Sequence, residues 1–177
     1  MRFDSPLGLS PRSAALRYEK GRKANRNMFE LTTEASLLST FRPVDRRRVE
    51  LSPDVRFPMV VNDYVTWPFG KRLFLVFALP GAAPRGICFE SEEPGPPVAH
   101  MCDWCHQVGL GARVGLLTAR RDRERTAGVL VCSDLGCRDR LEYFADRKGI
   151  DVAPKITSLL ERMSRFADTL YGDPTKS

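Results

Sequence analysis

The sequence has little of what several common protein classes require. It contains two histidines in 177 residues, so general acid–base chemistry by imidazole has few candidate residues. It has no Ser/His/Asp set, no P-loop and no G-x-G-x-x-G motif. No apolar run approaches the roughly 20 residues that a membrane-spanning helix needs. From these absences we expect no enzymatic activity, no small-molecule substrate and no membrane partner.

The first residues, MRFDSPLGLSPRSAALRYEKGRKANRN, do not contain the apolar core that a secretory signal peptide needs. We therefore expect a cytoplasmic, reducing location. Structural disulfides are rare in such a compartment, so the five cysteines of the chain need another explanation.

Positive charge is concentrated at the start of the chain. The net charge is +6, and residues 1–27 hold seven Lys/Arg and two acidic residues, which leaves only +1 for the other 150 residues. This segment has few apolar residues and no helical or strand period. We therefore expect residues 1–27 to be a disordered basic extension that the fold does not need.

The first half of the chain predicts one helix and one hairpin. LTTEASLLSTF (31–41) has a threonine that can cap a helix, followed by apolar residues at helical spacing. Residues 42–58 are charged and contain prolines, which indicates a loop or an edge. The dense apolar run 71–80 predicts a buried strand, and residues 87–91 predict its return strand in a β-hairpin. The proline-rich segment 92–100 is typical of a linker.

The second half predicts another hairpin and two helices. Apolar segments 114–119 and 127–131 flank a polar tip that carries four arginines, namely Arg120, Arg121, Arg123 and Arg125. Residues 137–149 have one apolar helical face and end near a glycine. Residues 154–171 place six apolar side chains on one stripe. Burial of each is worth roughly 1.5–3 kcal/mol, so this stripe predicts a helix packed on the core.

Four of the five cysteines form two close pairs. Cys102 and Cys105 make a C-x2-C pair, Cys132 and Cys137 make a C-x4-C pair, and 26 residues separate the pairs. Tetrahedral zinc is typically bound by two such pairs brought together from distant segments. The first pair fits a short knuckle, and the second fits a strand end followed by a helix start, where the helix dipole favours a thiolate. The pattern predicts one closed, structural Zn²⁺ site.

Other readings of these cysteines stay open from spacing alone. The string Cys102 to His106 is C-x-x-C-H, which can attach a c-type haem, although attachment requires export. The same pair could serve thiol redox chemistry or metal storage, and four unrelated buried cysteines are a further alternative. His106 could replace a cysteine ligand or hydrogen-bond to a thiolate. We expect Cys88 to be a small core residue of a strand.

The strings MCDWCH, VGLLTARR and AGVLVCSDLGC resemble the C-terminal treble-clef zinc finger of the FBP family, most specifically between Ala99 and Phe144. This is the module of elongation factor G-binding proteins, shared with fusidic-acid-resistance proteins. The resemblance implies that one zinc is held by Cys102, Cys105, Cys132 and Cys137. It also implies a cytoplasmic bacterial protein that binds a translation factor, elongation factor G, on or near the ribosome.

Together these observations predict an α+β fold made of small β-hairpins, a treble-clef zinc finger and a C-terminal amphipathic helix. We expect three parts: the basic extension 1–27, an N-terminal α+β part at 28–98, and the finger with its helix at 99–177. The expected partner surface is the hairpin tip and the exposed side of the helix at 137–148, that is, Arg120, Arg121, Arg123, Arg125 and Tyr143.

The alternative function is an RNA-binding finger that contacts ribosomal RNA. The arginines of the hairpin tip and the basic extension would contact phosphates, and Trp104 or Tyr143 would stack on a base.

Overall fold

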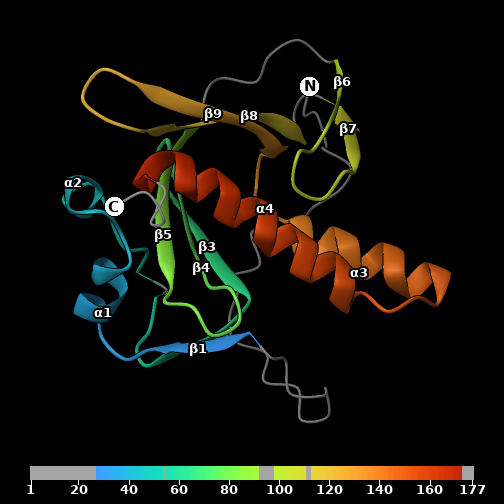
Figure 1. Ribbon diagram of the computed structural model, residues 1–177, viewed down its shortest axis with the longest axis horizontal. Helices are drawn as coiled ribbons and strands as arrows, with labels where there is room; N and C mark the ends of the chain where they lie inside the picture. The colour runs from blue at the N-terminus through green and yellow to red at the C-terminus, as the bar shows by residue number, and fades with distance from the viewer. Residues whose placement is uncertain (1–26, 54, 92–97, 111–112, 173–177) are drawn as a thin grey trace, which may run out of the picture.

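The computed structural model of the protein describes residues 27–53, 55–91, 98–110 and 113–172 (Figure 1). In chain order its elements are β1 (Met28–Leu31), α1 (Glu34–Ser39), α2 (Pro43–Arg46), β2 (Met59–Asn62), β3 (Tyr64–Phe69), β4 (Arg72–Phe77), β5 (Arg85–Ser91), β6 (Ala99–Met101), β7 (Val108–Leu110), β8 (Val114–Arg120), β9 (Thr126–Cys132), α3 (Cys137–Lys148) and α4 (Ala153–Tyr171). The fold is α+β, as the sequence predicts.

The expected basic extension lies outside the described residues except for its last one. Asn27 is buried, with 8% of its surface exposed, and its carbonyl accepts a hydrogen bond from the backbone N–H of Asp63 at 3.0 Å. The predicted extension therefore includes one residue, Asn27, that belongs to the packed structure.

The central sheet joins the two predicted hairpins. It is antiparallel, with the strand order β3-β4-β5-β8-β9. The predicted hairpins β4–β5 and β8–β9 are confirmed, and β5 pairs directly with β8, placing Phe89 opposite Ala119. The parts expected at 28–98 and 99–177 thus share a single sheet.

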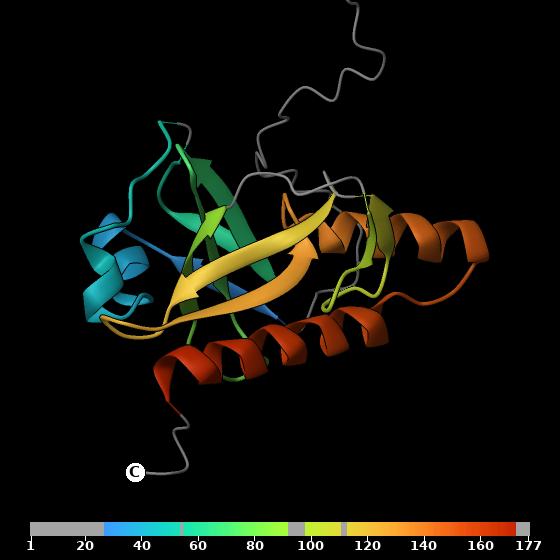
Figure 2. The ribbon, with the colours of Figure 1, turned by 90° about the horizontal axis from the view of Figure 1, so that it is seen from above.

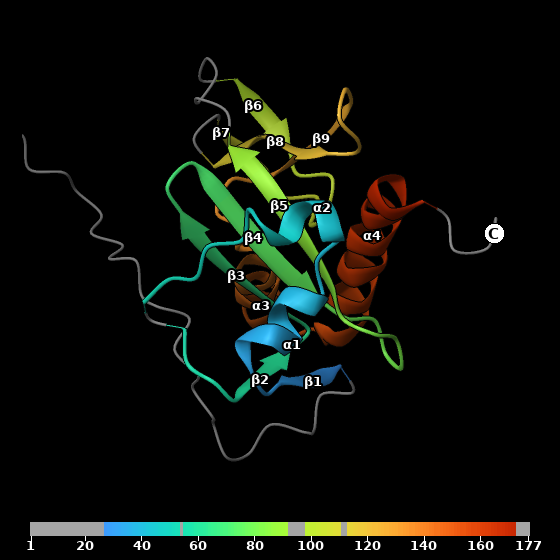
Figure 3. The same cartoon turned by 90° about the vertical axis from the view of Figure 1, so that its left-hand side faces the viewer.

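Both faces of this sheet are covered, which explains the dense apolar run of β4. Leu73, Leu75 and Phe77 point into one core with α4 and the finger, whereas Phe74 and Val76 point into a second core. The second core is closed by α1, which Thr33 caps through a hydrogen bond from the N–H of Ser36, and by the β1–β2 pair. Figures 1, 2 and 3 show α4 along one side of the sheet and α1 on the other.

Several short elements differ from the sequence prediction. The strands β1, β2 and β3 were not anticipated, and the segment 42–58 contains the one-turn helix α2, which Pro43 begins. The expected linker 92–100 overlaps β6, whose partner β7 also has only three residues. Strands this short have no readable alternation, since their pairing is decided by tertiary contacts. Among the described helices, none combines the length and apolar character needed to cross a membrane.

Candidate metal centre

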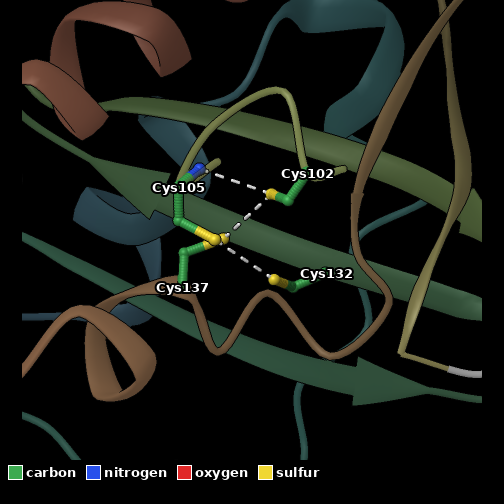
Figure 4. Close-up of side chains that lie close together, drawn as sticks. All are labelled: Cys102, Cys105, Cys132 and Cys137. Carbon is green, nitrogen blue, oxygen red and sulfur yellow. Dashed lines mark hydrogen bonds between the residues drawn. The ribbon is translucent and has the colours of Figure 1, made fainter. Parts of the chain in front are cut away.

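Three separate elements bring the four predicted cysteines to one point (Figure 4). Cys102 and Cys105 lie in the turn between β6 and β7, Cys132 is the last residue of β9, and Cys137 is the first residue of α3. The order is knuckle, β-hairpin and helix, with ligands on the knuckle and at the helix start. This is the treble-clef arrangement that the spacing predicted.

The knuckle is fixed by its own backbone and by β9. The N–H of Cys105 points at the sulfur of Cys102 at 3.4 Å, and the N–H of His106, whose φ is 58°, donates to the carbonyl of Cys102 at 2.8 Å. Asp103 then contacts Leu130 of β9 twice. Its N–H donates to the Leu130 carbonyl at 2.7 Å, and its carboxylate accepts the Leu130 N–H at 3.0 Å. The first ligand pair is therefore held in register with the strand that carries Cys132.

The second pair is held by a tight turn before α3. The N–H of Leu135 donates to the carbonyl of Cys132 at 2.8 Å, and Leu135 has a φ of 53°. Asp134 accepts the N–H of Gly136 at 2.9 Å and both terminal nitrogens of Arg140 at 2.9 and 3.1 Å. Burial opposes ionisation of Asp134, but these hydrogen bonds lower its pKa. The turn is thus held by a charged carboxylate.

The spacing of the sulfurs fits a tetrahedral metal. All four Sγ atoms lie within 4.8 Å of one another, with Cys102 and Cys137 3.7 Å apart and Cys105 and Cys132 3.6 Å apart. Zn–S bonds of about 2.3 Å in a tetrahedron place sulfurs about 3.8 Å apart, whereas a disulfide needs about 2.05 Å. All four side chains are buried, with at most 4% exposed. The site can bind one metal ion, and its all-thiol donor set fits zinc.

The electrostatics of the cluster also favour a cation. Hydrogen bonds from its three neighbours lower the pKa of Cys102, whereas hydrogen bonding to Cys102 raises the pKa of Cys132 and Cys137. The physical cause is that a thiolate formed at one sulfur disfavours a second negative charge close by. A divalent cation in the centre removes this repulsion and allows all four thiols to ionise.

Two residues that the sequence reasoning missed support the second ligand pair. The hydroxyl of Tyr64 in β3 donates to the carbonyl of Leu135 at 2.8 Å and accepts the N–H of Arg138 at 2.9 Å. Burial raises the pKa of Tyr64 well above its ordinary value. Arg138 in turn forms a salt bridge at 3.0 Å with Asp63, whose side chain is fully buried. No local sequence signal marks these contacts, which join β3 to the start of α3.

The geometry decides several of the alternatives. His106 is exposed, and the four sulfurs come together without it. Trp104 is 1% exposed and packs against Phe89 and Phe166, so the prediction that it stacks on an RNA base was wrong. Cys88 is a buried residue of β5, as predicted, and burial raises its pKa to about 11. A haem bound at Cys102 and Cys105 would not explain why the second pair completes the same site.

The expected partner-binding residues do not form one surface. The tip between β8 and β9 and the helix α3 lie at opposite ends of the long axis (Figures 1 and 2). Tyr143 in α3 is 54% exposed, and its hydroxyl accepts a hydrogen bond from Arg147 at 2.7 Å. At the tip, Arg125 pairs with Asp122 at 3.3 Å. A partner that contacts Tyr143 and the arginine tip together must span the molecule.

Comparison with known families agrees with this geometry. The family model described as the FBP C-terminal treble-clef zinc-finger matches residues 33–170. The match begins before α1 and ends at the last turn of α4, so it covers the N-terminal core as well as the cysteines. Among curated proteins, none matches the chain significantly.

Proposed function

Since the chain belongs to the FBP C-terminal treble-clef zinc-finger family, we propose that it is a non-enzymatic zinc module that binds elongation factor G on or near the bacterial ribosome. The observation that carries this proposal is the buried four-cysteine site within a family match that spans most of the described fold. The family resemblance supplies the partner, and the site supplies the role of the metal. A cytoplasmic location is part of the same proposal.

The donor set supports a structural metal. A catalytic zinc usually has three protein ligands and keeps one position open for water. Here four cysteine sulfurs fill the tetrahedron. Zinc would therefore hold the knuckle, the end of β9 and the start of α3 together, and the exposed surface of the fold would carry the binding function.

An RNA-binding role is the second candidate, and the hairpin tip favours it. The side chains of Arg120, Arg121 and Arg123 are exposed and make no hydrogen bond or salt bridge within the described part of the chain. Unpaired arginines on a loop are typical phosphate contacts. The arginines of the tip could bind either a protein or an RNA partner, so an experiment is needed to distinguish the two functions.

Binding of purified elongation factor G and of a ribosomal RNA fragment, measured over a range of salt concentrations, tests the two functions. We expect the complex with elongation factor G to survive nuclease treatment and moderate salt, because contacts at the core of a protein interface are screened less than phosphate contacts. A chain that chiefly binds RNA would lose affinity steeply, with a log–log slope of about 0.7 per phosphate contacted on a single strand. Zinc-loaded protein that binds neither the factor nor the ribosome at micromolar concentration would contradict the proposal.

A further inference from the structure

A cleft of about 510 Å³ lies at the end of the molecule that is far from α3. Its walls come from three elements that are distant in the sequence: α2, the tip between β8 and β9, and the last turn of α4. Figures 1 and 3 show these three elements side by side. The metal centre contributes no residue to this cleft, so the cleft is a separate feature of the fold.

Arg42 builds the floor of the cleft and is not available to a ligand. Its guanidinium donates to Asp45 at 2.8 Å, to the carbonyls of Arg121 at 2.9 Å and Leu170 at 2.8 Å, and also to the carbonyl of Arg120. One side chain therefore ties α2, the hairpin tip and the end of α4 together. Because these contacts use the guanidinium donors, the shape of the cleft is fixed before any partner arrives.

Three other arginines of the cleft have no such partners. Arg120, Arg121 and Arg123 line it, are exposed, and make no side-chain hydrogen bond or salt bridge to a described residue. Arg125 differs, because it pairs with Asp122, whose carboxylate also accepts the N–H groups of residues 124 and 125. The tip is thus a rigid turn that presents three unpaired guanidinium groups.

The opposite wall is apolar. Val44 is 65% exposed, and it lines the cleft beside Pro43 and the ring of Tyr171. The hydroxyl of Tyr171 is turned inward, where it donates to the carbonyls of Thr40 at 3.1 Å and of Gly86. A ligand in the cleft therefore meets apolar surface on one side and positive charge on the other.

We propose that this cleft binds a short acidic segment of a protein partner, in which an apolar side chain sits between carboxylates. The apolar side chain would contact Val44, Pro43 and Tyr171, and the carboxylates would pair with the three free arginines. This inference rests on the proposed function, since it describes how a protein partner would dock. Compared with the partner surface expected from the sequence, the proposed contact surface leaves out Tyr143 and Arg125. It includes the apolar wall of the cleft instead.

The lining favours a peptide over RNA. The tip carries Asp122 among the arginines of the cleft, and a continuous phosphate backbone would face this carboxylate. The ring of Tyr171 already contacts the guanidinium groups of Arg42 and Arg85, which lie 5.7 and 4.7 Å from its centre, so a base would compete with them to stack on the ring. The carboxylates of a peptide can be spaced so that none of them faces Asp122. An apolar side chain of the peptide can also pack against the apolar wall of the cleft, which a phosphate group cannot do.

The test uses the full zinc-loaded chain and a fluorescent hexapeptide of sequence EDLFDE, followed by anisotropy. We expect saturable binding. Changing the three arginines to glutamine together should weaken binding about tenfold, because the three exposed ion pairs with the peptide carboxylates are lost together. Val44→Asp should also abolish binding, although it leaves every arginine in place. The matched control replaces Arg113, Lys148 and Lys155, three exposed cations outside the cleft lining, with glutamine and should bind as the wild type does.

Three results would overturn the inference: no peptide binding at millimolar concentration, equal losses in the control and the cleft variants, or a single-stranded RNA hexamer that binds more tightly than the peptide. Elongation factor G is measured in parallel to separate the two proposals. If the wild type and the arginine variant bind the factor equally well, the proposal that the cleft is the binding site is contradicted and the proposed function is kept. If the wild type does not bind the factor but binds the peptide as expected, elongation factor G is the wrong partner and the proposed binding site is kept.

Discussion

Tyr64→Phe tests how the N-terminal core supports the metal centre. The change removes one oxygen, which donates to Leu135 at 2.8 Å and accepts from Arg138 at 2.9 Å. Each hydrogen bond contributes about 1 kcal/mol net, and a backbone group left unsatisfied away from water costs more. The ring remains, so the packing is kept. We expect the free energy of unfolding to fall by about 2 kcal/mol, which lowers the Tm of a chain of this size by roughly 4–8 °C.

The assay is urea unfolding at a fixed free zinc concentration, since bound metal adds to the apparent stability. Tyr143→Phe is the matched control. It removes the same atom from an exposed tyrosine whose hydroxyl contacts only Arg147 among the described residues, and surface changes of this kind usually stay within about 0.5 kcal/mol. Zinc release to a chelator provides a second readout. Tyr64→Phe should bind the same amount of zinc as the wild type and release it faster, because Leu135 lies in the turn between two ligands.

A Tyr64→Phe protein whose stability and zinc release match those of the Tyr143→Phe control would contradict this role of Tyr64. That result would mean that the backbone groups of Leu135 and Arg138 find water or other partners at no cost. The contact between β3 and the start of α3 would then have no role in holding the ligands.

Three further changes test the rest of the structure. Cys132→Ser should lose the zinc that the wild type holds at one per chain, whereas Cys88→Ser should keep it, and full zinc content in the first variant would contradict the four-sulfur site. Arg138→Met should cost about 2 kcal/mol, because it removes the salt bridge between Arg138 and the buried Asp63, and Asp63→Asn in the same chain should recover part of the loss measured by urea unfolding. Removal of residues 1–26 should leave the Tm and the zinc content unchanged, and a large drop in either would show that this segment packs on the fold.

The sequence predicted the parts of the structure that local spacing controls. The C-x2-C and C-x4-C pairs are held by short turns, so their spacing alone indicates the ligands. The same holds for α4, whose apolar side chains recur at helical spacing, and for the run from Leu73 to Phe77, which is typical of a buried strand. In each case a few neighbouring residues carry the whole signal.

The remaining features depend on contacts between distant segments. Tyr64 reaches Leu135 across 71 positions, and Arg42 reaches Arg120 across 78. Nothing near Tyr64 or Arg42 in the sequence marks them as residues that join distant segments. Under the RNA-binding alternative Trp104 was a candidate to stack on a base, but its ring packs on α4. Burial at such a position is decided by the element that covers it.

The strand β9 connects the metal centre with the arginine tip that lines the proposed binding cleft. Cys132 ends it at the metal centre, Thr126 begins it beside the arginine tip, and Leu130 between them is hydrogen-bonded to the knuckle through Asp103. A metal that holds Cys132 therefore also fixes the register of β9 against β8, where Arg120 pairs with Thr126. The position of the tip beside the cleft is therefore held by β9 and by the hydrogen bonds that Arg42 donates to the carbonyls of Arg120 and Arg121. A structural zinc can thus support binding at the opposite end of the hairpin without touching the partner.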